Sequence, residues 1–538
     1  SQISAGRSFL LALAGDSAPC ISLPPRGRTI LPGISVNLGC TAAGTPPLAY
    51  QWQHNGGDIS DATNSTLWVT NFVSVDVGDY RVVVTNRHGK VTSPAAVLTA
   101  GPIIAWGNNS SEQIWIPAGV TNPIQVAGGD SYSAALDAEG APIQWGGRFG
   151  LEMIPTNLGR CTAISAGFGF TLALLENGTV AAWGANFNGE TNVPPGLTNV
   201  VAVSANNGFS LALLADGRVA TWGDPFLVQS NVVAGLSDVV AISAGGFHSL
   251  ALKADGTVFA WGRNAGAATN VPADVADVVA IAASFGYSVA LKADGTVAVW
   301  GTSNPSVTNP PAGLSDVVAI GAGFNGGRLA LRSDGSLVAW GPNQYGESNI
   351  PPGVNNVIRI ASGWSHHLAI VGDGKPAITG HVPRRSVRAG GTLRLAALAA
   401  GAQPLRYRWQ LNGVDIAGAT NATLTVSGMT AAEAGSYRCI VSNDLGSITG
   451  PITTVTVISE PLYFDTSVDG LHYTNSVIHL RLTNLSGVGP VTIYASTNLA
   501  DWEGIHTNAP VAGTLDFTDL TATNHAARYY RAVEGPQP

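Results

Sequence analysis

The chain has 538 residues, of which 45% are hydrophobic and only 11% charged, with a formal net charge of −8. This length allows several domains with buried cores. The 26 Lys and Arg residues are scattered too thinly to favour nucleic acid or an anionic membrane as a partner. The chain starts at Ser1 and shows neither a signal-like segment nor a transmembrane run, so we expect a mature exported product or a fragment.

The first predicted element is a β-hairpin within residues 1–17. The stretch ISAGRSFLLAL, from Ile3 to Leu13, places two apolar runs on either side of a short turn that contains glycine. This pattern is typical of two paired strands. The apolar positions that would carry an assembly contact are Ile3, Phe9, Leu11 and Leu13.

Residues 18–100 and 375–458 form a matched pair of segments. Each contains alternating short apolar runs, a central tryptophan, and a tyrosine within D-V-G-D-Y or E-A-G-S-Y. Segments of about 80 residues with this pattern resemble the immunoglobulin fold. The resemblance implies that the tryptophans lie in a sandwich core and that the tyrosines form the tyrosine corner. These landmarks are Trp52 and Trp409, and Tyr80 and Tyr437.

The cysteines depart from the immunoglobulin pattern. Cys40 stands at the first expected position, but Val82 occupies the position of its usual partner. In the second segment Cys439 stands at the later position and Ala397 at the earlier one. Neither segment can therefore form the usual disulfide between its two sheets. Cys20 lies on a neighbouring predicted strand, where it either bonds to Cys40 or stays free, and the other two cysteines are expected to be single buried thiols.

Residues 101–374 repeat a unit of about 39 residues that ends in a Trp-Gly pair. A clean copy, residues 239–262, reads VVAISAGGFHSLALKADGTVFAWG. Its short runs of Val, Ile, Ala and Leu alternate with Ala-Gly and Asp-Gly joints. These joints predict tight turns between strands, because such turns need positive φ angles that glycine adopts freely. The tryptophans of the pairs are Trp106, Trp145, Trp183, Trp222, Trp261, Trp300 and Trp340.

A unit of this length with three or four short strands corresponds to one propeller blade, and seven blades close a ring. We expect the tryptophans to fill the space between adjacent blades. We also expect the aspartates of the Asp-Gly pairs to be turn residues and not calcium ligands. These aspartates are Asp216, Asp255, Asp294 and Asp334.

The pattern A-G-x-x-x-S-L-A-L-x-x-D-G-x-V-x-A-W-G resembles the repeat of the regulator of chromosome condensation family. The short period and the connector N-V-P-P-G-L, Asn192–Leu197, are most similar to secreted bacterial members of that family. The resemblance implies a propeller fold. It implies no single function, because the family includes exchange factors, inhibitors and surface proteins.

The two halves of the repeat unit are not equally frequent. Within 101–374 the chain starts on a lone Trp-Gly strand, IIAWG, which ends at Gly107. It ends on a lone hairpin half, IASGWSHHLAI, which ends at Ile370. Paired together, these two pieces complete a seventh blade and close the ring. The hairpin from Ile3 to Leu13 is then an eighth copy that the ring does not need.

Three interpretations of this surplus hairpin remain open. The favoured one makes it the tail of an upstream propeller unit, because the junction LALAGDSAPCI that follows it mirrors LAIVGDGKPAI after the ring. In the second, residues 18–100 are an insertion in the first blade, and the hairpin pairs with IIAWG in place of the last hairpin. In the third, the hairpin enters the ring of a neighbouring molecule and joins chains into a polymer.

The last stretch, residues 459–538, contains alternating runs such as VIHLRLTNL and PVTIYASTNL. It resembles a small fibronectin-like sandwich of the kind found at the end of bacterial surface proteins. The complete prediction is an all-β protein. It consists of a seven-bladed β-propeller at 101–374, two immunoglobulin-like sandwiches at 18–100 and 375–458, and a C-terminal β-sandwich.

The sequence predicts no catalytic, cofactor or metal site. Its ten histidines are scattered, and the adjacent pair His366 and His367 would point to opposite faces of one strand. His248 stands where other units carry an aromatic residue, so we expect a structural role for it. Carboxylates brought together from separate blades would still be compatible with a polysaccharide-active enzyme, which remains an alternative.

The favoured hypothesis is a non-enzymatic extracellular protein, structural or adhesive, that binds a protein or a glycan at the cell surface. We expect neither nucleic acid binding nor membrane insertion. The main alternative is a subunit of a filament or sheath, joined by the N-terminal hairpin or the terminal domains. On the ring, the predicted contacts form an aromatic rim that follows the Ala-Gly turns: Phe168, Phe170, Phe209, Phe247, Phe285, Tyr287, Phe324 and Trp364.

Overall fold

The computed structural model describes residues 3–5, 10–12, 17–147, 154–224, 236–301, 309–325, 327–458, 463–464, 471–474, 477–486, 491–497, 503–509, 512–519 and 529–534. Within these ranges the regular elements are strands, apart from the 3-10 helices η1 (Ser74–Asp76), η3 (Ala265–Ala267) and η4 (Ala431–Glu433). No helix in the described part of the chain has the length and apolar character needed to cross a membrane. The predicted all-β class is therefore confirmed.

The chain divides into two compact units. The first contains Ser1–Arg384, Arg394–Leu424 and Ser436–Thr453. The second contains Arg385–Leu393, Thr425–Gly435 and Thr454–Pro538. The repeat region lies wholly in the first unit.

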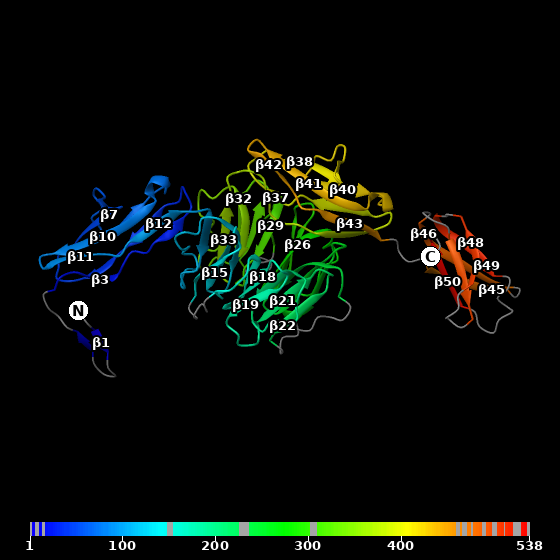
Figure 1. The fold of residues 1–538 in the computed structure, drawn as a ribbon, viewed down its shortest axis with the longest axis horizontal. Coiled ribbons are helices and arrows are strands. Elements are labelled where there is room, and N and C mark those ends of the chain that lie inside the picture. Colours follow the sequence, from blue (N-terminus) through cyan, green and yellow to red (C-terminus); the bar gives the residue numbers. More distant parts are fainter. Residues whose placement is uncertain are drawn as a thin grey trace. The chain divides into compact units, whose positions relative to one another are not determined.

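The repeat region folds into three-stranded antiparallel sheets, one for each repeat unit, which we call blades (Figure 1). In each blade the order is inner, middle and outer strand, and each inner strand contacts that of the next blade. The strands of the six continuous blades are β14 (Pro123–Gly128), β15 (Tyr132–Asp137), β16 (Pro142–Gly146), β17 (Cys161–Ala166), β18 (Phe170–Leu175), β19 (Val180–Gly184), β20 (Val200–Asn206), β21 (Phe209–Leu214), β22 (Val219–Gly223), β23 (Val239–Ala244), β24 (His248–Lys253), β25 (Val258–Gly262), β26 (Val278–Ala283), β27 (Tyr287–Lys292), β28 (Val297–Gly301), β29 (Val317–Ala322), β30 (Arg328–Arg332) and β31 (Leu337–Trp340).

The turns between the middle and outer strands follow the Asp-Gly prediction. Gly256 and Gly295 have φ angles of 84° and 81°, in the region that glycine adopts without a steric cost. In each of these two Asp-Gly pairs, one side-chain oxygen of the aspartate accepts hydrogen bonds from the residue two positions later. For Asp255 the donors are the backbone N–H and the hydroxyl of Thr257, at 3.0 and 2.6 Å. The aspartates therefore act as turn residues.

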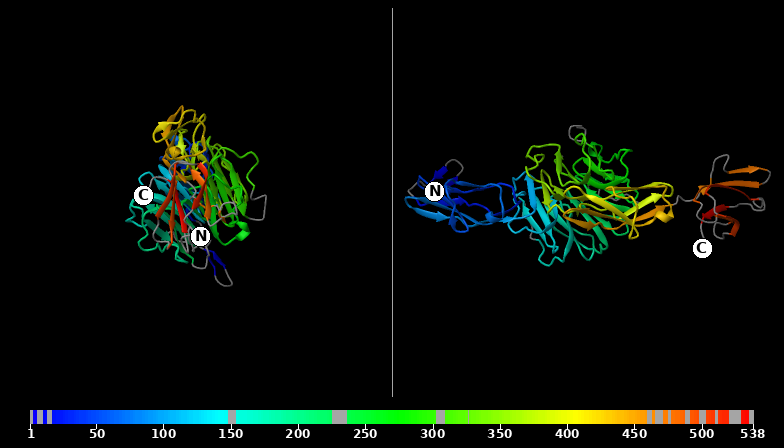
Figure 2. Two further views of the ribbon diagram at one scale, coloured as in Figure 1. Left: turned by 90° about the vertical axis from the view of Figure 1, so that its right-hand side faces the viewer. Right: turned by 90° about the horizontal axis from the view of Figure 1, so that it is seen from above.

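The seventh sheet is built from the two ends of the repeat region. It consists of β13 (Ile103–Gly107), β33 (His366–Val371) and β32 (Val357–Ser362), with Ile103 paired to Ile370. Its inner strand contacts β14, so the last blade adjoins the first. Figure 1 shows β33 beside β15, and Figure 2 gives two further views of these sheets. The predicted pairing of IIAWG with the last hairpin is confirmed, and the alternative pairing with the N-terminal hairpin is wrong.

The tryptophans of the Trp-Gly pairs are buried and join neighbouring blades, as predicted. The indole N–H of Trp222 donates to the carbonyl of Glu190 at 2.8 Å, and that of Trp300 donates to Ala268 at 2.9 Å. Each acceptor lies in the connector that follows the outer strand of the preceding blade. The same bond closes the ring, because Trp106 donates to the carbonyl of Glu347 at 2.9 Å.

The N-terminal hairpin has the register of a blade hairpin. β1 (Ile3–Ala5) and β2 (Leu10–Ala12) pair with Ile3 opposite Ala12 and Ser4 opposite Leu11. In the closing blade the sequence-equivalent pairs, Ile360 with Ala369 and Ala361 with Leu368, are the same. The predicted assembly residues Phe9 and Leu13 lie outside the described residues.

The first sandwich has a core of strand residues around Trp52, which is fully buried and donates its indole N–H to the carbonyl of Asn64 at 2.9 Å. The hydroxyl of Tyr80 donates to the carbonyl of Asp76 at 2.9 Å, which confirms the predicted tyrosine corner. The strands are β3 (Cys20–Leu23), β4 (Arg28–Ile30), β5 (Val36–Gly39), β6 (Thr41–Ala43), β7 (Ala49–His54), β8 (Gly57–Asp58), β9 (Thr66–Val69), β10 (Gly78–Asn86), β11 (Gly89–Thr92) and β12 (Ala96–Ala100).

The second immunoglobulin segment repeats these contacts. Trp409 is buried, as predicted, and donates its indole N–H to the carbonyl of Asn421 at 3.0 Å. Tyr437 is also buried. Its strands in the first unit include β34 (Ala377–Ile378), β36 (Thr392–Ala396), β37 (Ala399–Ala400), β38 (Arg406–Leu411), β39 (Val414–Asp415), β41 (Gly435–Asn443) and β42 (Gly446–Thr449). The second unit holds most of β35 (Arg384–Arg388), β40 (Thr423–Ser427) and β43 (Thr453–Ile458).

Every blade has a β-bulge, and the exposure of the bulged residue shows where the second immunoglobulin segment covers the ring. The register between inner and middle strands skips one residue, for example between Val239 and Ala241. The residue skipped in this blade, Val240, is only 7% exposed, whereas its equivalent in another blade, Val201, is 52% exposed. Val240 is covered because it belongs to an apolar cluster that includes Val382 and Leu398 of the second immunoglobulin segment.

The second unit also contains the C-terminal strands. β46 pairs with β44, β45 and β49, and β47 pairs with β48 and β50. The apolar residues Leu482, Val491 and Ile493 form its buried core. The strands are β44 (Tyr463–Phe464), β45 (Leu471–Thr474), β46 (Val477–Ser486), β47 (Val491–Ser496), β48 (Glu503–Asn508), β49 (Ala512–Asp519) and β50 (Tyr529–Glu534).

Candidate functional site

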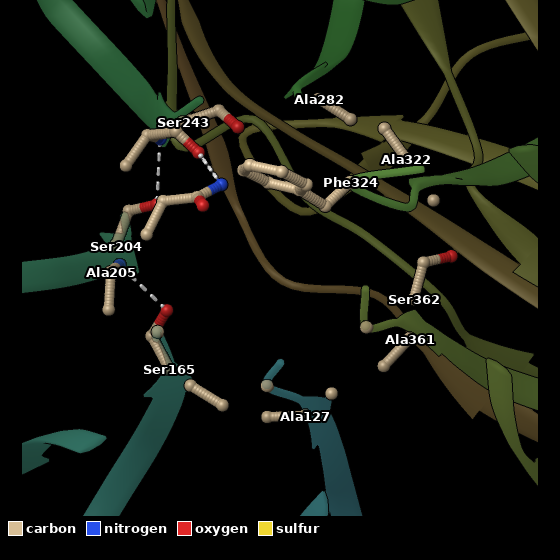
Figure 3. A pocket seen from close by; sticks show the side chains of 18 of the residues that line it. Ala127, Ser165, Ser204, Ala205, Ser243, Ala282, Ala322, Phe324, Ala361 and Ser362 are labelled. Carbon is tan, nitrogen blue, oxygen red and sulfur yellow. Dashed lines mark hydrogen bonds between the residues drawn. The ribbon is translucent and has the colours of Figure 1, made fainter. Parts of the chain in front are cut away.

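The inner strands of the blades surround a cavity of about 420 Å³. Most of its wall consists of small side chains, because the repeat places Ala, Ser or Gly wherever an inner strand faces the centre. Figure 3 shows Phe324 pointing into this cavity from the turn after β29. Ser204 and Ser243 lie on one side of the ring, and Ala361 and Ser362 lie on the other.

Three serines on neighbouring inner strands line one side of the cavity, and we call them the serine ladder: Ser165, Ser204 and Ser243. Each hydroxyl oxygen accepts a backbone N–H from the next blade at 2.9 Å. The donors are Ala205, Ala244 and Ala283, respectively. Among the described residues none of the three hydroxyls donates a hydrogen bond, so each has a hydrogen left to offer to the cavity.

Five aromatic rings contact one another in sequence, and we call them the aromatic arc: Phe247, Phe285, Phe324, Trp364 and Phe168. The last three of these line the cavity. Their successive ring centroids are 4.4, 4.4, 3.9 and 5.6 Å apart. All five come from turns between an inner and a middle strand. Phe285 is 41% exposed and Phe168 is 36% exposed, so part of the arc remains open to solvent.

Of the eight residues predicted for the aromatic rim, the structure brings these five together, whereas it buries Phe170, Phe209 and Tyr287. These three begin the middle strands β18, β21 and β27 and are buried. Middle strands are covered on both faces by neighbouring sheets, so their first side chains pack between blades. Tyr287 also donates its hydroxyl hydrogen to the carbonyl of Gly323 at 2.7 Å.

The buried histidines join blades and do not face the cavity. The Nε2 atom of His248 lies 2.8 Å from the Ser288 hydroxyl of the next blade, and that of His366 lies 2.9 Å from Ser133 across the ring closure. Burial lowers the pKa of His248 to about 4 and that of His366 to about 3. The predicted structural role of His248 is confirmed.

His366 and its neighbour point to opposite faces of β33, as predicted. The Nδ1 atom of His367 lies 2.9 Å from the Ser362 hydroxyl, and its ring contacts Trp106 at a centroid distance of 5.4 Å. Burial lowers the pKa of His367 to about 4. Over the described ranges, no three His, Cys, Asp or Glu side chains come together as a group able to hold a metal ion.

Of the two outcomes left open for Cys20 and Cys40, the structure shows the second, because both thiols are free. In the pairing of β3 with β6, Cys20 lies opposite Ala43, three residues beyond Cys40. Three residues of extended strand span about 10 Å, whereas a disulfide needs Cα atoms within about 7 Å. Cys161 and Cys439 are buried free thiols, as predicted.

The serine ladder was not predicted, although its signal is present in the repeat. The motif I-S-A or V-S-A carries serine in three units, whereas Ala127, Ala282, Gly321 and Ala361 occupy the same place in the others. A serine in an apolar strand often has no specific structural role. Its role becomes clear only when the neighbouring inner strand is known to lie within hydrogen-bonding distance.

The class of protein is defined by two kinds of domain, and known families match both. The regulator of chromosome condensation (RCC1) repeat matches residues 161–190, 200–226 and 239–265. The immunoglobulin domain matches residues 18–86 and 375–443. The chain therefore contains RCC1 repeats in an RCC1-like propeller region, together with two immunoglobulin domains.

Curated relatives are similar to the chain over short segments. The basement membrane-specific heparan sulfate proteoglycan core protein of Mus musculus is 35% identical over 114 residues, which are 21% of this chain and 3% of that protein. Hemicentin-1 of Mus musculus is 30% identical over 129 residues, which are 22% of this chain and 2% of that protein. The chain thus spans a very small part of the relatives that it matches.

Solved structures show likeness to part of the chain. Prp20p from Saccharomyces cerevisiae is 19% identical and covers 51% of this chain and 92% of its own, with a TM-score of 0.42. The ectodomain of the receptor kinase CR4 from Physcomitrella patens is 20% identical and covers 57% of this chain and 90% of its own, with a TM-score of 0.37. At these TM-scores neither likeness carries a functional argument.

Proposed function

We propose that this chain is a non-enzymatic extracellular protein, structural or adhesive, that binds a protein or glycan partner at the cell surface through its ring. The aromatic arc carries the proposal. Five rings from separate repeat units contact one another, three of them line the cavity, and two of the five are more than one-third exposed. Contiguous exposed apolar surface of this kind is typical of interaction sites.

The modular composition supports an extracellular setting. Immunoglobulin domains flank the repeats at 18–86 and 375–443. One partial relative carries the basement membrane in its name. In our proposal the ring has seven blades over 101–374, residues 459–538 form a fibronectin-like sandwich, and the protein is of the exported bacterial kind.

Surface retention tests the adhesive role. Labelled full-length chain is applied to cells of the source organism and to their extracellular material, and the retained label is compared with that of a Phe285→Ala/Trp364→Ala variant. We expect the variant to be retained less. The matched control is Phe187→Ala, because Phe187 is 79% exposed and lies outside the cavity. Equal retention of all three proteins would contradict the proposal.

A non-enzymatic role is tested separately. The chain is incubated with a panel of extracellular polysaccharides, and new reducing ends are measured. We expect none above background. Release that grows with protein concentration would favour the polysaccharide-active alternative instead.

A filament subunit is the second candidate, and the N-terminal hairpin favours it. β1 and β2 have the blade register, yet they pair only with each other among the described residues. Two-stranded hairpins are marginal in isolation, and a third strand would stabilise this one. Electron microscopy of the full chain and of a variant that lacks residues 1–16 tests this. Polymers that need the hairpin would support it, whereas dispersed particles of both proteins would exclude it.

A further inference from the structure

The central cavity has two unlike walls. On one side the serine ladder presents three hydroxyl groups whose oxygens already accept backbone hydrogens at 2.9 Å. On the other side Phe324 and Trp364 stack at a centroid distance of 3.9 Å, next to inner-strand positions that carry Ala or Gly. A ligand that fills the cavity therefore meets hydrogen-bond donors on one face and apolar rings on the other.

The charge of the lining restricts the ligand further. Among the described residues that line the cavity, none is Lys or Arg, and the charged side chain is Asp130. One oxygen of Asp130 accepts the backbone N–H of Gly169 at 3.1 Å. An anionic ligand beside Asp130 would meet this carboxylate with no Lys or Arg in the described lining, which disfavours phosphates, sulfates and uronic acids there. The guanidinium of Arg263 lies over the ring of Phe247, at the end of the arc outside the lining.

The size of the cavity fits one small cyclic group. A volume of about 420 Å³ lies in the range of small-molecule sites, which run from about 300 to 1,000 Å³. A pyranose has hydroxyl oxygens around its edge that can accept from the serines. It also has a face of C–H groups, and the negative face of an aromatic ring attracts such weakly positive hydrogens.

We propose that the cavity mouth binds the terminal pyranose of a neutral glycan, with its C–H groups against the rings of Phe324 and Trp364 and its hydroxyls toward the serine ladder. This assignment rests on the proposed function and deepens it, because it names the glycan as the partner of the ring and the cavity as the place of contact. No covalent step is involved. The ring acts as a lectin site.

Calorimetry and saturation-transfer NMR on the full chain test the proposal with cellobiose, maltose and N,N′-diacetylchitobiose as neutral probes. A disaccharide of glucuronic acid is the anionic comparison. We expect at least one neutral probe to bind and the anionic one to bind about tenfold more weakly or not at all, a difference of about 1.4 kcal/mol. Equal binding of the anionic probe would overturn the neutral assignment.

Two variants locate the binding site. Trp364→Ala removes one stacking surface and should weaken binding by about tenfold or more. Ala282→Leu leaves the aromatic arc and the serine ladder in place but extends a larger side chain from the cavity wall, and it should also weaken binding. Thermal unfolding confirms that each variant folds, and Phe187→Ala is the matched control that should bind normally. Unchanged binding in both cavity variants, or no binding of any neutral probe, would overturn the proposal.

The same variants separate this inference from the adhesive role. If Trp364→Ala lowers retention on cells while no saccharide binds, the glycan assignment fails and the adhesive role stands. If neutral saccharides bind through Trp364 while retention is unchanged, the adhesive role fails and the glycan site stands.

Discussion

The two sides of the central cavity connect neighbouring blades by different means. On the serine-ladder side, side-chain hydroxyls accept backbone hydrogens from the next inner strand, as Ser204 does from Ala244 at 2.9 Å. On the other side the equivalent residues, such as Ala282 and Gly321, have no hydroxyl. There the turns join the blades, both through hydrogen bonds such as that from the backbone N–H of Trp364 to the carbonyl of Gly129 at 2.9 Å and through the stacked rings of the aromatic arc. One repeat thus supports two kinds of junction, one made by serine hydroxyls of the inner strands and the other made by the backbone and the aromatic rings of the turns.

Of the changes considered, acid should lower the free energy of unfolding most. It should destabilise the closing blade more than the other blades. The unfolded imidazole takes up a proton near pH 6.5, whereas His248, His366 and His367 have pKa values of about 4, 3 and 4 when folded. Below pH 6.5 the unfolded state therefore binds more protons, so the free energy of unfolding falls as the pH falls. At pH 4.5 the loss is about 2–3 kcal/mol for each histidine.

Two of these histidines lie in β33 and one in β24, so hydrogen exchange should accelerate more in the closing blade than in the blade of β24. Exchange rates at pH 7 and pH 4.5, corrected for their intrinsic pH dependence, measure this difference. His366→Phe places a residue there that Phe170 and Phe209 show to be compatible with the start of a middle strand. It should remove part of the acid sensitivity. An unchanged pH profile in this variant would contradict the assignment.

Removing one rung of the serine ladder should have the next largest effect. Ser204→Ala deprives the backbone N–H of Ala244 of its acceptor. Leaving a buried donor without a partner costs about 1–3 kcal/mol. Urea denaturation measures the free energy of unfolding, with Ala361→Ser on the opposite side as the comparison. If Ser204→Ala is as stable as the unaltered chain, the ladder does not hold the blades together.

Truncating the arc should cost less. Trp364→Ala removes the stacked contacts with Phe324 and Phe168. Aromatic pairs contribute about 0.5–1.5 kcal/mol beyond the area that they bury, and Trp364 is only half-buried. We expect a decrease of about 1–2 kcal/mol by the same denaturation assay. A loss as large as that of a core tryptophan would show that the arc is mainly structural and not a binding surface.

The smallest effect should come from an ion pair between the ring and the second immunoglobulin segment. Arg394 donates to Asp277 at 2.7 Å, but both side chains are exposed. Exposed pairs contribute about 0.2–1 kcal/mol and are screened by salt. Arg394→Ala should therefore lower the melting temperature slightly at low salt and not at all at 1 M salt, as measured by calorimetry. A large loss at both salt concentrations would mean that the side chain acts by packing.

The repeat made the propeller region predictable, because each Trp-Gly pair and Asp-Gly turn has a local physical cause. Closure was also predictable, since the unpaired halves at Gly107 and Ile370 needed each other. The features that the sequence did not predict depend on how strands distant in sequence pack and pair. Phe168 lies in the turn before β18, and Phe170 begins that strand two residues later. The ring of Phe168 is open to solvent, whereas that of Phe170 is covered by the next sheet. The state of Cys20 stayed open because the sequence does not give the register that places Cys20 opposite Ala43.

The closing blade has a mechanical consequence. The chain enters the ring at Ile103 and leaves it at Ile370, and these two residues face each other across one antiparallel pair. Once the contacts of the second immunoglobulin segment with Val240 and Asp277 are broken, tension applied at Ile103 and Ile370 would pass through β13 and β33. It would also separate the two strands from their common end, breaking hydrogen bonds one after another instead of all together. Under load the ring would thus open between β13 and β33 while the remaining sheets stay intact.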